Sequence, residues 1–282
     1  MADPPTPAPP FTAGGMPVEH SRWTRFDRWW LLFFAVLAIV ALLVYGVQPP
    51  YGDIFAFIKD GIVVTLQLTI VSFLFILLVG MLGGLGRVSG NRIIRGASSL
   101  YVEVVRGIPV LVWLLWIWYA LPQLRDSLGN WVIGFASGVG QMILDARIPA
   151  FTAAVVGFTV AYGAYMTEVF RAGIQSIPKG QMEAARSLGM RYIQAMRYII
   201  LPQAVRVILP PMGNEFVTLL KDSSLVSVLA VSDLTRRGRE FVARSFLSFD
   251  TFTLVALIYL VMTLFFTRVT TSAERRMSVE KR

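Results

Sequence analysis

The chain has 282 residues, of which 55% are hydrophobic and 15% are charged. Soluble domains carry about 25% charged residues, and several apolar stretches here reach the roughly 20 residues that cross a bilayer core, so an ordinary soluble fold is excluded. The absence of cysteine excludes disulfides, thiolate metal sites and a cysteine nucleophile. Basic flanks of membrane helices explain the net charge of +9 better than nucleic-acid binding does.

The hydropathy pattern predicts an all-α, polytopic membrane protein with six transmembrane helices. Residues 1–28 are proline-rich and predict a disordered tail. The single histidine, His20, lies in this tail, so neither a metal site nor a catalytic role is expected for it. Residues 29–60 hold an extra N-terminal helix and an outer loop, and residues 271–282 form a basic cytoplasmic tail. The five remaining spans, within residues 61–270, are predicted over 61–86, 98–121, 150–174, 203–222 and 251–267. The span over 203–222, the fifth of the six, is predicted to be interrupted by Pro210, Pro211 and Gly213.

The loops predict an orientation. With the N-terminus in the cytoplasm, the inside segments hold 15 lysines and arginines and the outside segments hold seven. The positive-inside rule therefore places both termini in the cytoplasm. The outer loop over 231–250 departs from this rule with four arginines and predicts a surface helix. Residues 131–144 are apolar but too short to span, and they predict an interfacial or re-entrant helix on the outer face.

The longest inside loop, residues 177–203, predicts a short helix, a turn and a second helix. Pro178 and Gly180 form a start signal, and Gly189 breaks or turns the helix. A second amphipathic stretch over 191–200 is predicted to end at Pro202. A mere linker need not be this long, helical and rich in alanine, whereas a helix with small residues on its face suits docking into a groove of another protein.

In this loop the sequence resembles a known family. The spacing of Glu183-Ala184-Ala185, Gly189, Ile199 and Leu201-Pro202 is similar to the EAA signature of ABC importer permeases. Three further strings, over 101–109, 164–181 and 219–228, are similar to the branch that transports polar amino acids. The resemblance covers about residues 61 to 270, and the extra N-terminal helix departs from the five-span members. It implies that residues 177–202 dock into a cleft of a cytoplasmic ATPase through Glu183, Ala184, Ala185, Leu188 and Gly189.

The resemblance implies a multi-pass permease subunit of an ATP-driven importer in the bacterial inner membrane. Its expected partners are a dimer of ABC ATPase subunits, a second permease subunit of the same or a sister chain, and a periplasmic or extracellular substrate-binding protein. The chain has no G-x-x-x-x-G-K-[ST] loop, so ATP and Mg are expected on the ATPase, and neither a cofactor nor enzymatic activity is expected here. An importer of the same architecture for another small solute, such as methionine or an organic ion, and an ion-driven secondary transporter remain alternatives.

Ionisable residues inside the spans are candidates for function. Glu103 with Arg106, and Glu168 with Arg171, have i,i+3 spacing at similar depths, so a cluster of four charges between two helices is predicted. A latch that fixes helix packing is the favoured interpretation, and a gate or a substrate contact is the alternative. Pro109 is predicted to bend its span.

A second group of candidates lies in the fifth span. Lys221 could bind the carboxylate of an amino acid, and Asn214 or Glu215 its ammonium group. Alternatively, Lys221 and Asp222 mark the end of that span and pair locally. The sequence contains no nucleophile and base pair suited to hydrolysis, so no catalytic residue is predicted.

Overall fold

A computed structural model describes residues 28–47 and 49–278, and within those ranges each element is a helix. The predicted disordered tail and His20 lie outside the described residues. The α-helices are α1 (Arg28–Ala41), α2 (Tyr51–Arg87), α3 (Arg92–Arg106), α4 (Val110–Leu115), α5 (Leu121–Ile133), α6 (Ser137–Asp145), α7 (Ala150–Gln175), α8 (Lys179–Ser187), α9 (Tyr192–Ala195), α10 (Leu201–Asp222), α11 (Leu234–Ser245) and α12 (Ser248–Ser278). Shorter π and 3-10 turns join them: η2 (Leu42–Gly46), η3 (Trp116–Ala120), η4 (Met196–Ile200) and η5 (Ser223–Leu229).

Four helices among the described residues are long and apolar enough to cross a membrane: Trp29–Gly46, Tyr51–Arg87, Ala150–Gln175 and Ser248–Glu274. The bent pair of Arg92–Arg106 with Val110–Ile133 makes a fifth if it is counted as one span. The remaining predicted span corresponds to α10, which mixes apolar with charged residues over 22 positions. The polytopic all-α class is confirmed, whereas only four or five of the six predicted spans meet the requirement of length and composition.

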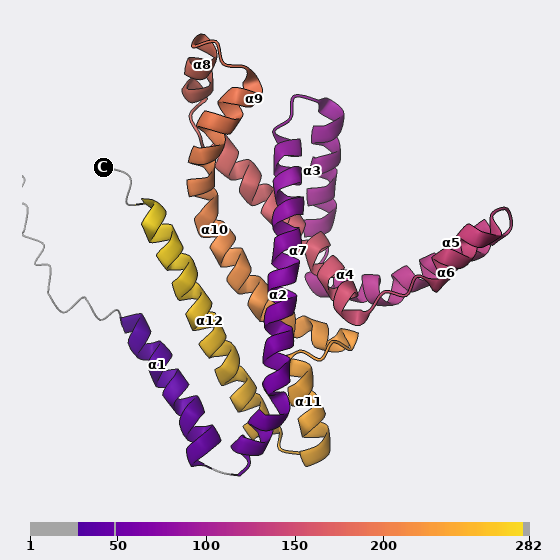
Figure 1. The fold of residues 1–282 in the computed structure, drawn as a ribbon, viewed down its shortest axis with the longest axis vertical. Coiled ribbons are helices and arrows are strands. Elements are labelled where there is room, and N and C mark those ends of the chain that lie inside the picture. Colours follow the sequence, from indigo (N-terminus) through magenta and orange to yellow (C-terminus); the bar gives the residue numbers. More distant parts are fainter. Residues whose placement is uncertain (1–27, 48, 279–282) are drawn as a thin grey trace, which may run out of the picture.

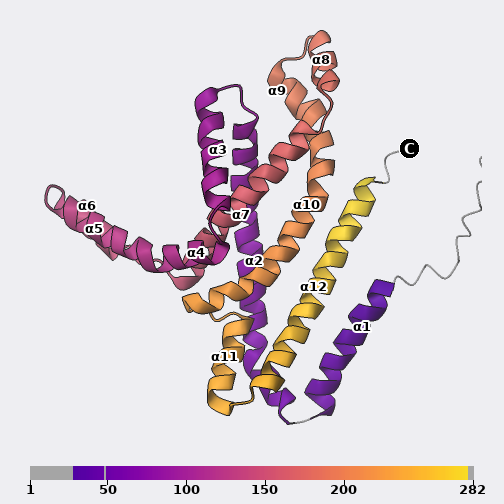
Figure 2. The ribbon, with the colours of Figure 1, turned by 180° about the vertical axis from the view of Figure 1, so that it is seen from behind.

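The extra N-terminal helix forms the outer layer of the bundle, alongside α12 (Figures 1 and 2). The indole Nε1 of Trp29 donates a 3.4 Å hydrogen bond to the carbonyl of Leu264. Val40 and Val44 are buried with Ile258 and Met262 in an apolar cluster that α1 and η2 share with α2 and α12. The helix is therefore packed onto the core through α12.

Helices α2 and α7 form the central contact of the bundle. Gly80, Gly83 and Gly84 of α2 face α7, and a Cβ atom added at Gly84 would lie 2.5 Å from the Cβ of Phe170. Cβ atoms at the other two glycines would overlap the side chains of Met166 and Thr167. The close approach expected from small residues four apart is therefore present.

The bend predicted at Pro109 for the span over 98–121 is confirmed, and it is sharp enough to divide the segment into two helices. Helix α3 ends at Arg106, and α4 begins at Val110 after a bend of 99°. Pro109 has no N–H to donate, and it disfavours helical geometry at the residue before it, so the α3 helix cannot continue through this point. Beyond the bend, α5 and α6 form a hairpin that projects sideways from the bundle (Figures 1 and 2).

The predicted interruption of the fifth span is also wrong, because α10 runs unbroken through Pro210 and Pro211. Two prolines remove two backbone donors, but tight contacts hold the helix on either side. Ile208 packs against Gly173 of α7, and a Cβ atom at Gly213 would lie 2.9 Å from the Cβ of Thr270 on α12. Packing against two neighbours therefore overrides the local preference of the prolines.

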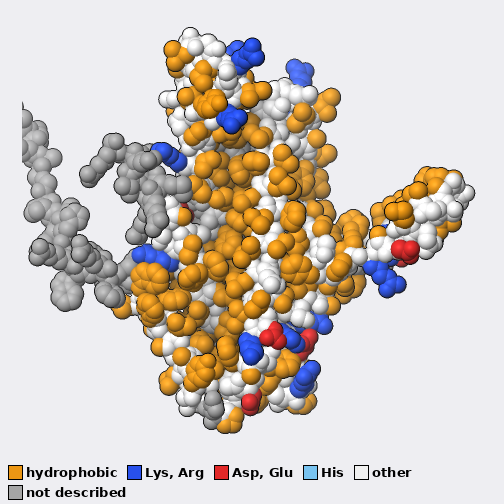
Figure 3. All heavy atoms as spheres, viewed as in Figure 1, with side chains coloured by type: hydrophobic (Ala, Val, Ile, Leu, Met, Phe, Trp, Pro, Cys, Tyr) orange, Lys and Arg blue, Asp and Glu red, His pale blue; other side chains and the backbone are white. Residues whose placement is uncertain are grey.

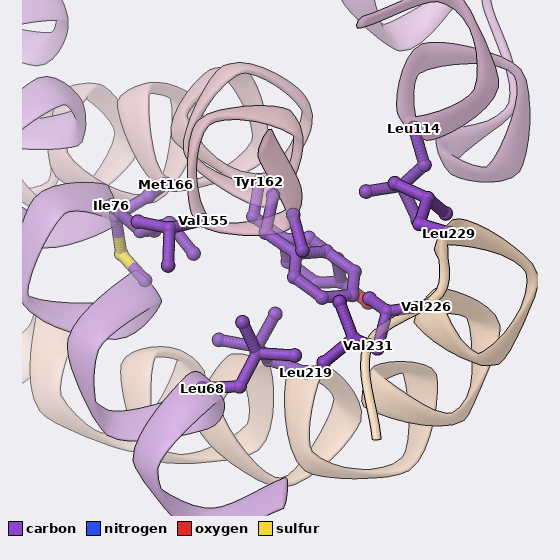
Figure 4. Close-up of a cluster of buried hydrophobic side chains, with 12 residues drawn as sticks. Leu68, Ile76, Leu114, Val155, Tyr162, Met166, Leu219, Val226, Leu229 and Val231 are labelled. Atoms are coloured by element: carbon purple, nitrogen blue, oxygen red, sulfur yellow. The ribbon is translucent and has the colours of Figure 1, made fainter. Parts of the chain in front are cut away.

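The main apolar core lies where α2, α7, α10 and η5 meet. Leu68, Tyr162, Leu219 and Val226 are buried there, and the ring of Tyr162 points into the cluster (Figure 4). Outside this core, apolar side chains cover the middle of the visible face, and charged side chains gather near its ends (Figure 3). This distribution is the one expected of a chain solvated by lipid.

Candidate coupling surface and intramembrane polar site

The loop with the family-like signature forms the far end of the molecule (Figure 1). Helix α8 closes with two hydrogen bonds, one from the Met190 N–H to the Ala185 carbonyl (3.1 Å) and one from the Gly189 N–H to the Arg186 carbonyl (2.9 Å). This pair of bonds is a Schellman motif, and it requires a left-handed residue after the last helical turn. Gly189 occupies that position with φ +83°, so the glycine is needed for the turn itself.

Four of the five predicted coupling residues face outward, namely Glu183, Ala184, Leu188 and Gly189. Leu188 is 84% exposed, and a Cβ atom at Gly189 would meet nothing within 4 Å. Ala185 is the exception, because it is buried at 4% exposure. The exposed surface at the tip of the loop carries Leu188 together with charges of both signs, Glu183 and Arg186, and Ala185 lies on the inner side.

Side chains on both sides of this tip tie it to two long helices. Ile174 of α7 is buried with Met196 and Ile200 of η4 and with Ala204 and Ile208 of α10. The second predicted helix of the loop does not end at Pro202: α9 passes through the π turn η4 directly into α10. Pro202 has no N–H to donate to the preceding turn, and the wider π turn η4 comes directly before it, so the helical chain continues past the proline. The loop is thus continuous with α10 and packed against α7.

Glu168 carries an ionic contact between α2 and α7. Its Oε2 atom accepts a 2.7 Å hydrogen bond from Nη1 of Arg87, the last residue of α2. Arg171, one turn further along α7, pairs with the same carboxylate and also donates to Gln175. An ion-paired group of three residues therefore lies near the signature loop, and its third member, Arg87, is a residue that the sequence analysis placed in a loop.

The predicted cluster of four charges does not form. Glu103 is exposed and makes no ion pair with a described residue, and Arg106 lies over the ring of Tyr165 at 5.0 Å. Helix α3 turns its apolar residues Val102 and Val105 towards α7, so Glu103 falls on its outer side, and Arg106 at the end of the helix contacts the ring of Tyr165. The i,i+3 spacing places two charges on one helix face, but it does not decide which face packs against the neighbour.

A second polar group lies deeper, between α7 and α10. The hydroxyl of Tyr162 donates a 2.6 Å hydrogen bond to Oδ2 of Asp222. Glu215, half-buried and seven residues before Asp222, interacts electrostatically with Asp222 and with Arg106. Two carboxylates, a phenol and a guanidinium therefore share one region where three helices meet.

Two of the three predicted substrate contacts on α10 lie outside this polar site. Asn214 and Lys221 are both exposed, and Lys221 forms no ion pair with a described residue, so the predicted local pairing with Asp222 is absent. A spacing of seven residues aligns Glu215 with Asp222 on one face of the helix, and Lys221 lies about 100° away. The sequence analysis named Glu215 as an alternative to Asn214, and Asp222 only as a local partner of Lys221. The seven-residue spacing of the two carboxylates was the signal that could have joined them.

No group of three metal-ligating side chains occurs among the described residues. The polar site instead offers the carboxylates of Glu215 and Asp222 and the guanidinium of Arg106, which can bind a small charged molecule by ion pairs and hydrogen bonds.

A family model described as "Binding-protein-dependent transport system inner membrane component" matches residues 76–279. The chain belongs to this family. It is a permease subunit, and in this family ATP hydrolysis takes place on a separate subunit. The identification as an ABC importer permease is thereby confirmed.

Curated relatives agree with this family. The chain is 35% identical over 220 residues to the glutamine transport system permease protein GlnP of Escherichia coli, covering 78% of this chain and 92% of that protein. It is 37% identical over 188 residues to the L-cystine transport system permease protein TcyB of Bacillus subtilis, covering 67% and 72%. It is 32% identical over 232 residues to the glutamate/aspartate import permease protein GltJ of Escherichia coli, covering 81% and 91%.

Solved structures show the same architecture. A crystal structure of an amino acid ABC transporter with histidines matches with a TM-score of 0.67 and 39% identity, covering 78% of this chain and 94% of that chain. The MetNI methionine ABC transporter in an inward-facing form matches with a TM-score of 0.61 at 19% identity, covering 80% and 98%. The second likeness is one of fold alone.

Proposed function

We propose that this chain lines the pathway of an importer for a polar amino acid, and that α8 passes the motion of a separate ATPase into that pathway. One observation carries the proposal. The signature loop, α8 to η4, is the direct connection between α7 and α10, and these two helices carry Tyr162, Glu215 and Asp222. A displacement of α8 therefore moves both walls of the polar site.

The chemistry of the polar site fits an α-amino acid. Such a substrate has one carboxylate and one ammonium group, and each needs an opposite charge when it leaves water. Arg106 suits the carboxylate, and Glu215 or Asp222 suits the ammonium group. The curated relatives are transporters of glutamine, cystine, glutamate and aspartate by name, which supports this substrate class.

The same proposal includes three partner proteins. Glu183, Ala184, Leu188 and Gly189 form the surface that enters a cleft of an ATPase dimer, which holds ATP and Mg. A second permease, the same or a sister chain, completes the pathway, and a binding protein delivers substrate from outside. This arrangement requires α8 and both termini on the cytoplasmic side of the inner membrane.

Uptake by the reconstituted transporter tests the proposal. The chain would be placed in vesicles with its ATPase inside and its binding protein outside, and labelled glutamine, glutamate, cystine, histidine and arginine would be offered in turn. ATP-dependent uptake of one of them is expected. Uptake of methionine or an organic ion instead would assign another small solute to the same architecture. Uptake driven by an ion gradient without ATP would overturn the proposal.

A further inference from the structure

The α5–α6 hairpin leaves the bundle at a depth that can be worked out. Helix α3 has 15 residues and starts at Arg92, near the cytoplasmic end of α2 in the proposed orientation. At 1.5 Å per residue its far end lies about 22 Å away, in the outer half of a bilayer core of roughly 30 Å. The bend of 99° then turns the chain from the direction of the spans into the plane of the membrane.

One side of the hairpin is apolar and uncovered. Leu124, Leu128 and Trp131 form a stripe at i, i+4 and i+7 along α5, and each is at least half exposed, Trp131 at 70%. Figure 3 shows apolar side chains over much of the hairpin and charged ones near its base. The two helices meet backbone to backbone, since a Cβ atom at Gly140 would lie 2.8 Å from the carbonyl oxygen of Gly129. Helices of 13 and nine residues are too short to span, so the stripe suits the boundary of a lipid layer.

A groove of about 640 Å³ opens at the base of the hairpin, against the start of α7. Its walls are apolar and include Trp118, Leu121, Ile143 and Ile148. The charged residues that line it are Arg125 and Arg147. This size falls within the range of about 300–1,000 Å³ that is typical of ligand sites.

Arg125 reaches the segment that carries Arg147. Nη1 of Arg125 donates a 3.0 Å hydrogen bond to the carbonyl of Ala146, the residue before Arg147. Asp126 accepts from Nε and Nη2 of Arg125 and is its counterion. The side chain of Arg147 makes no ion pair or hydrogen bond with a described residue, so its positive charge is left to an external anion.

We propose that this groove binds one anionic phospholipid of the outer leaflet, with its phosphate at Arg147 and Arg125 and part of an acyl chain along the apolar wall. The ligand is a lipid because the groove belongs to a hairpin that lies in the membrane plane and because its walls are apolar. A free amino acid or inorganic phosphate would leave those walls in contact with water. The proposal rests on the orientation in the proposed function but on none of its transport steps.

Native mass spectrometry of the full chain in its complex tests the site. Samples would come from vesicles of phosphatidylcholine with a minority of phosphatidylglycerol, and the lipids retained per chain would be counted. The wild type is expected to retain one phosphatidylglycerol in preference to phosphatidylcholine. Arg147→Gln is expected to lower that retention by about five-fold, the effect of one basic residue on an anionic lipid at a membrane surface. Arg239→Gln, which removes an exposed arginine of α11 outside the groove, is the matched control and should retain the lipid.

Equal retention by the two variants would overturn the site, as would a wild type that retains no phosphatidylglycerol. Displacement of the lipid by inorganic phosphate alone would show an anion site without acyl recognition. Displacement by millimolar glutamine or glutamate would assign the groove to the substrate pathway. Either result contradicts the proposal. The measurement needs neither ATP nor uptake, so a failed transport assay and a failed lipid assay remain distinguishable.

Discussion

Tyr162 of α7 donates a 2.6 Å hydrogen bond to Asp222 of α10, 60 residues further along the chain. The tyrosine ring lies in the apolar core at 5% exposure, while its hydroxyl reaches the carboxylate. The bond ties the main core to the polar site, and it joins the two helices that flank the signature loop.

Tyr162→Phe removes this bond but keeps the ring. A carboxylate that loses a charge-assisted bond is destabilised by about 1.5–3 kcal/mol, and each 1.4 kcal/mol is a factor of ten in an equilibrium. We expect uptake at low substrate concentration to fall by roughly ten-fold or more while the complex still assembles. Tyr165→Phe is the control, because the hydroxyl of Tyr165 makes no hydrogen bond with a described residue. Equal uptake by the two variants would show that the bond has no role in transport.

Gly189→Arg should uncouple transport without removing the protein from the membrane. A side chain at φ +83° strains the turn by about 1–2 kcal/mol, but it meets no atom of this chain within 4 Å. The steric conflict would arise only with a docked ATPase, so uptake should fall by about ten-fold or more at normal membrane levels. Gly90→Arg is the control, because Gly90 also has open space around it and lies in the α2–α3 loop on the same side. Normal uptake by Gly189→Arg would count against docking at this turn.

The contact between Arg87 and Glu168 can be measured by a double-mutant cycle. Their side chains are 20% and 27% exposed, so screening by water is partial. We expect Arg87→Gln and Glu168→Gln to share a coupling energy of about 1 kcal/mol that weakens with added salt. The readout is the thermal midpoint of the purified protein at low and high ionic strength. Additive effects of the two substitutions would mean that the ion pair does not stabilise the α2–α7 contact.

We expect the stability of the folded protein to depend on pH through Asp233, which lies outside the spans. It caps α11 by accepting from the backbone N–H groups of Thr235 (2.9 Å) and Arg236 (3.2 Å), and burial raises its pKa from 3.8 to about 6. Between these values the folded state holds a proton that the unfolded state has lost. Stability contributed by Asp233 is therefore full below pH 4 and declines as the pH rises to 6, by on the order of 3 kcal/mol.

Asp233→Asn isolates this effect, because an amide oxygen still caps the helix but does not titrate. The thermal midpoint of the wild type should fall relative to that of Asp233→Asn as the pH rises from 4.5 to 7.5. Parallel curves for the two proteins would show that Asp233 does not carry the proton.

The sequence predicted the features that depend on local pattern. The long apolar runs, the turn at Gly189 and the close approach at Gly80 and Gly84 all appear in the structure. The surface helix expected within residues 231–250 is α11. Helix α2 starts at Tyr51, ten residues before the predicted start. A hydropathy criterion missed these residues because charged side chains such as Lys59 lower the local hydropathy.

The features that depend on how helices rotate against each other could not be predicted. Glu168 pairs with Arg87 rather than with the charges of α3, because the glycines of α2 bring Arg87 beside α7. Asp222 bonds to Tyr162 and not to Lys221. Lys221 is adjacent to Asp222 in sequence, and adjacent residues of a helix point in different directions. Spacing within one helix says which residues share a face, and only packing says what that face meets.

The glycine contact between α2 and α7 also limits how the molecule can move. The backbone of α2 at Gly83 and Gly84 lies directly against the side chains of Thr167 and Phe170, so we expect little sliding between the two helices. If α8 is displaced, the backbone should bend where the long helices are interrupted. These places are the break before Pro109 and the 3-10 turn after Asp222. We therefore expect α7 to move together with α2, and α10 to change its position relative to that pair.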